Sequence, residues 1–196
     1  MNTNYQEIDF LNSYSASTSV VPEVIERLIC DLRKINYKQD EIDEIVLSMD
    51  EAVTNAIQET MKTNEIVPRR TSTDVTDRRD ITVRYTISSD IFDATIIDHG
   101  QGLDIFNIIN ATPQTGSTNY INQIVSYATE SEKCKIKVRL NGREITLRGI
   151  GAGLKIILNF MDSITIDLID KEKILTQYVT EHTDGTIFNM KRKRRY

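Results

Sequence analysis

The segment from Glu41 to Thr60 constrains the fold of this chain more than any other stretch. Its apolar residues recur every three or four positions: Ile42, Ile45, Val46, Met49, Ala52, Val53, Ala56 and Ile57. This is the spacing of one face of an α-helix, so the segment predicts a helix that packs on a core along one side. Asp40 stands immediately before the segment and is a favourable N-terminal capping residue.

Two polar residues of this helix, Glu51 and Asn55, are four positions apart on the side away from the apolar stripe. Residues at that spacing lie one above the other, so a carboxylate and a carboxamide can reach the same point outside the helix. Such a pair could hold a metal ion and activate a nucleophile. Taken alone, it is more typical of a solvated face shared with Glu44 and Gln58, and only the later segments favour a site.

Length and composition bound the class of protein. A chain of 196 residues with 39% hydrophobic and 27% charged residues predicts one globular domain, 1–196, with a sizeable core. No apolar run is long enough to cross a bilayer and the N-terminus lacks a signal-peptide pattern, so we expect a cytoplasmic protein without membrane association. A net charge of -5 disfavours direct nucleic-acid binding.

Three further predictions surround the organising helix. Residues 7–13 predict a strand, and a second helix follows that begins near Pro22. The segment 62–80 is polar and of mixed charge, which predicts an exposed loop.

From residue 81 the hydrophobic period changes to two. The alternation predicts a β-hairpin over 81–87 and 92–96, with a turn between the strands. The second strand ends in DHGQG, where an acid, Asp98, is followed by Gly100 and Gly102.

The segment 103–148 is too long for a structureless connection in a compact domain unless it is a functional lid or carries elements of its own. Apolar residues between Tyr120 and Ala128 suggest a short helix there. Residues 135–147 predict a small hairpin with Asn141-Gly142 as its tight turn.

The segment 148–162, RGIGAGLKIILNFMD, places three glycines directly before a predicted helix: Gly149, Gly151 and Gly153. Glycines let the backbone approach a ligand closely, and the free N–H groups of a first helical turn favour an anion.

The rest of the chain predicts strands over 164–169, 174–182 and 186–190, with a turn at Asp184-Gly185, and ends in a basic tail, 191–196. The tail is either a solubilising, disordered end or an electrostatic contact for an acidic partner.

The order of these segments resembles that of the Bergerat ATP-binding fold of the GHKL superfamily. Their amino-acid sequences are similar to those of its anti-sigma-factor serine kinases. DEAVTNAI resembles the N-box of that family, DHGQGLDI its first glycine box, and GAGLKIILNFMDSITI its second glycine box with the following helix and strand. The resemblance covers nearly the whole chain. It implies an α+β two-layer sandwich with a mixed, mostly antiparallel β-sheet, helices on one face, and a long ATP lid over 103–148.

The resemblance also implies roles for individual residues. Asp98 would accept a hydrogen bond from the exocyclic amine of adenine, with Thr186 beside the base. Asn55 would bind Mg²⁺, and Glu51 would be the general base that accepts a proton from an incoming hydroxyl. The other residues implied to bind ATP come from the two glycine boxes: Gly100, Gly102, Gly149, Gly151, Gly153 and Leu154.

The function implied is that of an ATP-dependent protein serine kinase, a homodimer that sequesters a sigma factor and phosphorylates its STAS-type anti-anti-sigma antagonist. The alternative is a module that binds ATP to shape a partner surface, with little or no phosphotransfer; the presence of Glu51 favours the enzyme. The ATPase half of a histidine kinase is disfavoured, because no helical segment carries a histidine of the kind used for dimerisation. The chain departs from the family at Glu59, where histidine is frequent, and at Arg148, which stands one place away from a frequent arginine.

Overall fold

The computed structural model describes residues 7–66, 80–100, 123–128, 135–140, 143–147, 152–176 and 179–195. The chain order of the elements is β1 (Ile8–Ser15), α1 (Val20–Lys34), α2 (Gln39–Ile66), β2 (Asp80–Ile87), β3 (Ile91–Asp98), β4 (Gln123–Ala128), β5 (Lys135–Leu140), β6 (Arg143–Leu147), α4 (Ala152–Phe160), β7 (Ser163–Asp170), β8 (Leu175–Thr176) and β9 (Thr183–Lys193). None of the helices in this described part is long and apolar enough to cross a membrane.

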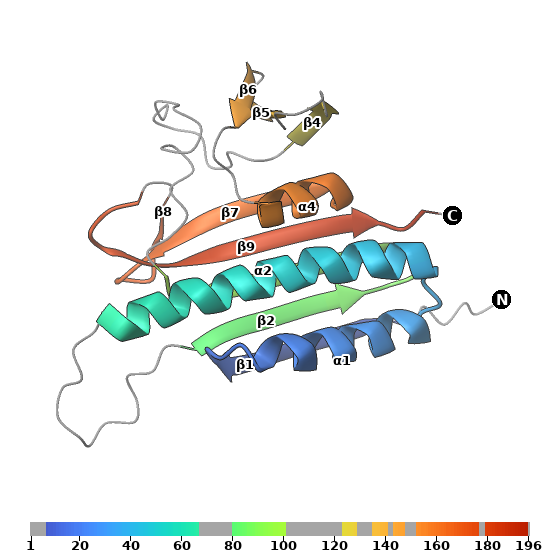
Figure 1. The fold of residues 1–196 in the computed structure, drawn as a ribbon, viewed down its shortest axis with the longest axis horizontal. Coiled ribbons are helices and arrows are strands. Elements are labelled where there is room, and N and C mark those ends of the chain that lie inside the picture. The colour runs from blue at the N-terminus through green and yellow to red at the C-terminus, as the bar shows by residue number, and fades with distance from the viewer. Residues whose placement is uncertain are drawn as a thin grey trace.

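The main sheet has six strands in the order β1-β2-β3-β9-β7-β8. Each of its strand pairs is antiparallel, so the expected mixed sheet is wrong for the described strands, which form an antiparallel one. A separate three-stranded sheet has the order β4-β5-β6. The expectation of an α+β protein with helices packed on a sheet is confirmed, and Figure 1 shows α1 and α2 running along the strands.

One face of the sheet carries the core. The alternation predicted for the hairpin is present: residues 81, 83, 85 and 87 of β2 and 92, 94, 96 and 98 of β3 are buried. The register places these two rows side by side and continues them onto β9, where Met190 lies opposite Ala94. The same cluster includes the apolar stripe of α2 and Ile157 and Leu158 of α4. Because successive side chains of a strand point to opposite faces, Asp98 ends β3 on the core side.

The organising helix is longer than its apolar stripe. It begins at Gln39, and the Ile42 N–H already bonds to the Lys38 carbonyl at 2.9 Å, so Asp40 lies in the first turn and is not the cap. At the other end it continues to Ile66, into the segment predicted as a loop. The predicted stripe is confirmed, and Glu51 and Asn55 are partly or fully exposed on the opposite side.

Three local predictions are wrong. Residues 123–128 form strand β4, not a helix, because a short apolar run with β-branched residues suits either state and here pairs with β5. Of the predicted strand over 174–182, the residues that the structure describes form only the two-residue strand β8. The Asp184-Gly185 pair lies inside β9 and not in a turn before it. The hairpin of β5 and β6 is confirmed by its pairing, although its turn residues 141–142 lie outside the described part.

The basic tail is mostly built into the fold, so a disordered end is wrong for its described residues. Lys191, Arg192 and Lys193 belong to β9. Arg192 is 1% exposed: its Nη1 donates to the Phe160 carbonyl at the end of α4 at 3.0 Å, and its Nη2 donates to the carboxylate of Glu44 on α2. The tail therefore ties α4 and α2 to the sheet.

Arg194 contacts two turns, the one between α1 and α2 and the one between β2 and β3. Its guanidinium lies 4.7 Å from the ring centroid of Tyr37 and donates to the carbonyls of Ile35, Asn36 and Ser89. The Asn36 carbonyl belongs to the turn between α1 and α2, where Asn36 has a positive φ of 60°. Ser89 belongs to the turn between β2 and β3.

We expect Arg194→Ala to lower the free energy of unfolding by about 1–3 kcal/mol, because a cation–π contact and hydrogen bonds from a charged donor are lost together. Urea denaturation measures the change. Lys193→Ala is the matched control, since it removes a positive charge from the exposed neighbouring residue and leaves its backbone bond to Asp162 in place. Equal urea midpoints for the two variants would show that the contacts of the Arg194 side chain do not stabilise the fold.

Candidate functional site

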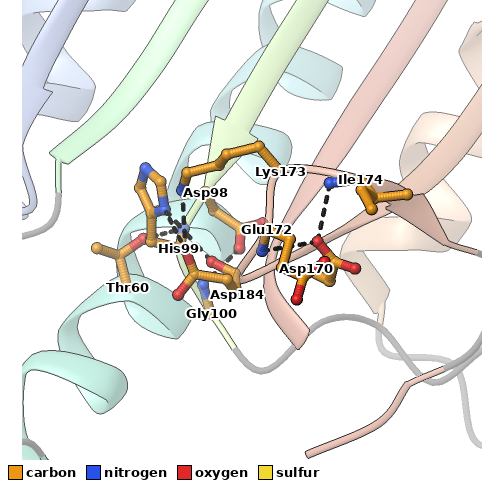
Figure 2. A network of polar contacts seen from close by, with 9 residues as sticks. All are labelled: Thr60, Asp98, His99, Gly100, Asp170, Glu172, Lys173, Ile174 and Asp184. Atoms are coloured by element: carbon orange, nitrogen blue, oxygen red, sulfur yellow. Dashed lines mark hydrogen bonds and ion pairs between the residues drawn. The ribbon is translucent and has the colours of Figure 1, made fainter. Parts of the chain in front are cut away.

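The first part of the site surrounds the carboxylate of Asp98. This residue ends β3 and is 8% exposed, and Thr186 of β9 is its partner in the strand register. The Gly100 N–H donates to Asp98 Oδ1 at 2.8 Å (Figure 2). Burial raises the pKa of Asp98 to about 6, and the negative charge of Glu59 adds to the rise; hydrogen bonds from Gly100 and Thr186 partly oppose it. Asp98 is therefore an acceptor in a dry, confined place that is still mostly ionised at neutral pH.

Gly185 makes this arrangement possible. A Cβ at this position would overlap the backbone carbonyl oxygen of Asp98 and lie 3.3 Å from the Cα of His99. Only a residue without a side chain lets β9 approach the end of β3 so closely. The approach brings Thr186, the next residue, to the Asp98 carboxylate.

Helix α2 closes the other side of Asp98. A Cβ at Gly100 would lie 2.6 Å from the Cβ of Glu59, so the chain after β3 runs directly against the helix. The hydroxyl of Thr60 accepts a hydrogen bond from the His99 N–H at 3.1 Å, which fixes the same junction (Figure 2). Lys62 Nζ lies 2.5 Å from Glu59 Oε1 and partly balances its charge.

The second part of the site joins α2 to the start of α4. A Cβ at Gly153 would overlap Glu51 Oε2 and lie 3.0 Å from the carboxyl carbon of Glu51 and 3.5 Å from Asn55 Nδ2. Gly153 of α4 therefore meets Glu51 and Asn55 of α2 at one point, although the two helices are far apart in the sequence. The first turn of α4 offers unpaired backbone N–H groups there, which favour an anion.

Helix α2 connects the two parts. Glu51 and Asn55 face the start of α4, while Glu59 and Thr60 contact the end of β3. Eight residues of helix separate Glu51 from Glu59, a rise of about 12 Å. The two groups of residues therefore lie along one helix, with a buried acceptor at one end and a carboxylate, a carboxamide and a helix N-terminus at the other.

The structure brings together most of the predicted site residues that it describes. Glu51, Asn55 and Gly153 meet at one end, and Asp98, Gly100 and Thr186 at the other. The side chain of Leu154 packs against the core, so its contribution to a ligand would come from its backbone. Three predicted residues lie outside the described part of the chain: Gly102, Gly149 and Gly151.

Sequence reasoning missed two contributors to the Asp98 pocket. Glu59 was noted only as a departure from the family pattern, although it lies eight residues after Glu51, about two helical turns along the same side of α2. The sequence predicts Asp184-Gly185 as a turn, since an Asp-Gly pair is a strong turn signal, and the resemblance places the Gly185-Thr186 pair at the entry to the last strand. The close approach of Gly185 to Asp98 depends on a strand pairing that no local pattern encodes.

Within the described ranges, no group of three or more His, Cys, Asp or Glu side chains is arranged to hold a metal ion. Mg²⁺ itself commonly binds through only one or two protein oxygens, and phosphates and waters complete its coordination.

Comparison of the chain with models of known protein families finds no match, and a search of curated proteins finds no significant relative. The interpretation of the site therefore depends on its geometry and on the resemblance of its motifs.

Proposed function

We propose that this protein is an ATP-dependent protein serine kinase with a Bergerat-type ATP site, and that it acts as an anti-sigma factor. The observation that carries the proposal is the contact of Gly153 with Glu51 and Asn55. It joins the segment that resembles the second glycine box to the pair that resembles the N-box. The same helix contacts the residues around the buried Asp98 at its other end, so the groups proposed to serve as base, metal ligand and adenine acceptor all border one helix.

The residues present fit an adenine nucleotide. Asp98 is a buried carboxylate acceptor, and one of its oxygens accepts a hydrogen bond from the Gly100 N–H. An exocyclic amine can donate to the remaining lone pairs, whereas guanine presents a carbonyl at that position and would meet a second acceptor. Gly153 lets the start of α4 pack directly against Glu51 and Asn55, because a Cβ at this position would overlap the Glu51 carboxylate.

The residues would divide the work as follows. Asp98 and Thr186 orient the base, and the first turn of α4 binds the phosphates. Asn55 supplies one oxygen to Mg²⁺. Glu51 accepts the proton of the incoming serine hydroxyl, which typically contributes about 10²–10⁴ in rate. Bound ATP with Mg²⁺ supplies the phosphoryl group and neutralises charge, and positioning accounts for most of the acceleration.

The partners in this proposal rest on the sequence resemblance. They are a sigma factor, which the protein would sequester, and a STAS-type anti-anti-sigma protein, whose serine it would phosphorylate, with the kinase itself a homodimer in the cytoplasm.

The test is incubation of the protein with labelled ATP, Mg²⁺ and candidate antagonists from the same genome, followed by analysis for phosphoserine. Transfer to one antagonist is the expected result. If no antagonist is phosphorylated but a sigma factor still binds in an ATP-dependent way, the protein is a binding module and not a kinase.

We expect the affinity for ATP to fall by about tenfold between roughly pH 7.5 and pH 5, because Asp98, with its pKa raised to about 6, becomes protonated over that range. ATP is recognised by the ionised form of Asp98. This form is lost as the pH falls through the pKa of Asp98, so the affinity for ATP decreases toward acid pH. Titration calorimetry at each pH measures the effect.

The phosphates of ATP also titrate in this pH range, so Asp98→Asn is the control. This variant retains the contribution of the phosphates, and its affinity for ATP should depend less steeply on pH. Parallel profiles for the two proteins would rule out Asp98 as the cause.

A further inference from the structure

Strand β9 has an extra residue where it enters the Asp98 pocket. Ile169 of β7 pairs with Gly185, but the next residue, Asp170, pairs with Thr183, so Asp184 is the residue inserted between the two pairs. This two-against-one arrangement is a β-bulge, which bends a strand locally and redirects a side chain. Asp184 is nevertheless 8% exposed, so its side chain is directed into the protein.

The side chains of Lys173 and His99 hold the bulge in place. Lys173 Nζ donates to Asp184 Oδ2 at 3.0 Å, and His99 Nδ1 lies 3.3 Å from the Asp184 backbone carbonyl (Figure 2). His99 follows Asp98 directly, so the bulge is attached to the end of β3 itself. The ion pair is unequally exposed: the side chain of Lys173 is 65% exposed and that of Asp184 only 11%. Water therefore screens the aspartate less than an ordinary surface carboxylate.

The turn that presents Lys173 is itself constrained. Asp170 Oδ1 accepts hydrogen bonds from the N–H groups of Glu172 at 2.9 Å and Ile174 at 2.8 Å. Lys173 has a positive φ of 65°, which is uncommon for a residue with a side chain. The bonds to Asp170 hold the residues on either side of Lys173, whose amine contacts Asp184 in the bulge.

The residues after the bulge contact Asp98. Gly185 packs against its backbone carbonyl, and Thr186 bonds to its carboxylate. The backbone path from Asp184 to Thr186 is two residues long, so displacement of the bulge would displace the groups that shape the Asp98 pocket.

We propose that Asp184 and Lys173 are positioning residues for base recognition: their ion pair fixes the β9 bulge, and the bulge sets Gly185 and Thr186 against Asp98. This inference rests on the proposed function, since it assigns the pocket to a base. Neither side chain touches the ligand. Both act through the backbone of β9.

Lys173→Ala tests the proposal, because it removes an exposed side chain and leaves the buried elements unchanged. Lys171→Ala is the matched control: Lys171 lies in the same turn, carries the same charge and donates to the Glu181 carbonyl at 3.0 Å instead. Lys173→Arg keeps the charge and should restore the wild-type behaviour. We expect Lys173→Ala to raise the Kd for ATP by about fivefold, with kcat at saturating ATP within about twofold of wild type.

A second measurement does not depend on nucleotide. Amide hydrogen exchange at Gly185 and Thr186 should be faster in Lys173→Ala than in Lys171→Ala when no ligand is present. Equal exchange and equal Kd in these two variants would overturn the positioning role. Wild-type protein that binds no ATP while Lys173→Ala still speeds exchange would refute the proposed function and restrict the ion pair to a structural role.

Discussion

Glu51→Ala should lower phosphotransfer by about 10²-fold or more while leaving the affinity for ATP nearly unchanged. Glu51 is placed beside Gly153 and Asn55, where a hydroxyl could approach the phosphates, and the substitution removes its carboxylate without touching the Asp98 pocket. Single-turnover transfer measures the rate, and calorimetry measures the affinity.

Gln58→Ala is the control for this experiment. Gln58 is exposed on the same side of α2, about two turns after Glu51, and is not among the nearest neighbours of Gly100 or Gly153. Both substitutions avoid the apolar stripe, so neither should alter the thermal midpoint by many degrees. Transfer at the wild-type rate by Glu51→Ala would show that this carboxylate is not the base. A large fall in its thermal midpoint would mean that it is a structural residue.

Asn55→Ala should abolish both Mg²⁺-dependent ATP binding and phosphotransfer, since the only protein ligand proposed for the metal is removed. This outcome differs from that of Glu51→Ala, which separates binding from transfer. The side chain of Asn55 is exposed, so little stability should be lost.

Titrating ATP with and without Mg²⁺ measures the effect, and Asn55→Asp is the control because it keeps an oxygen at the same place. If Asn55→Ala retains a wild-type response to Mg²⁺, the metal is held elsewhere and the role given to Asn55 is wrong.

Patterns repeated over many residues predicted the fold well. The stripe of α2 holds a period of 3.6 for about twenty residues, and the β2–β3 hairpin alternates without interruption, so local sequence determines both. The positions of Glu51 and Asn55 on one face of α2, and of Asp98 at the end of β3, were predictable for the same reason, because a helix face and a strand end are geometric consequences of these periods. The contact between α2 and Gly153 was expected only from the resemblance.

The predictions failed where the local structure depends on contacts with residues that are distant in the sequence. The basic run at the C-terminus has the local pattern of a solvated tail, yet Glu44 and the carbonyls of Asn36 and Ser89 surround its arginines. The Asp184-Gly185 pair has the local pattern of a turn, but strand pairing makes it a bulge. In both cases the partners lie more than ten residues away, or on another element, and a single sequence carries no signal for them.

Adenine recognition by Asp98 is best tested by titrating the wild-type protein with ATP and with GTP, each with Mg²⁺. We expect saturable binding of ATP, no comparable binding of GTP, and a loss of about 1–3 kcal/mol in ATP binding for Asp98→Asn. Equal affinity for the two nucleotides, or binding of neither, would contradict adenine recognition by Asp98.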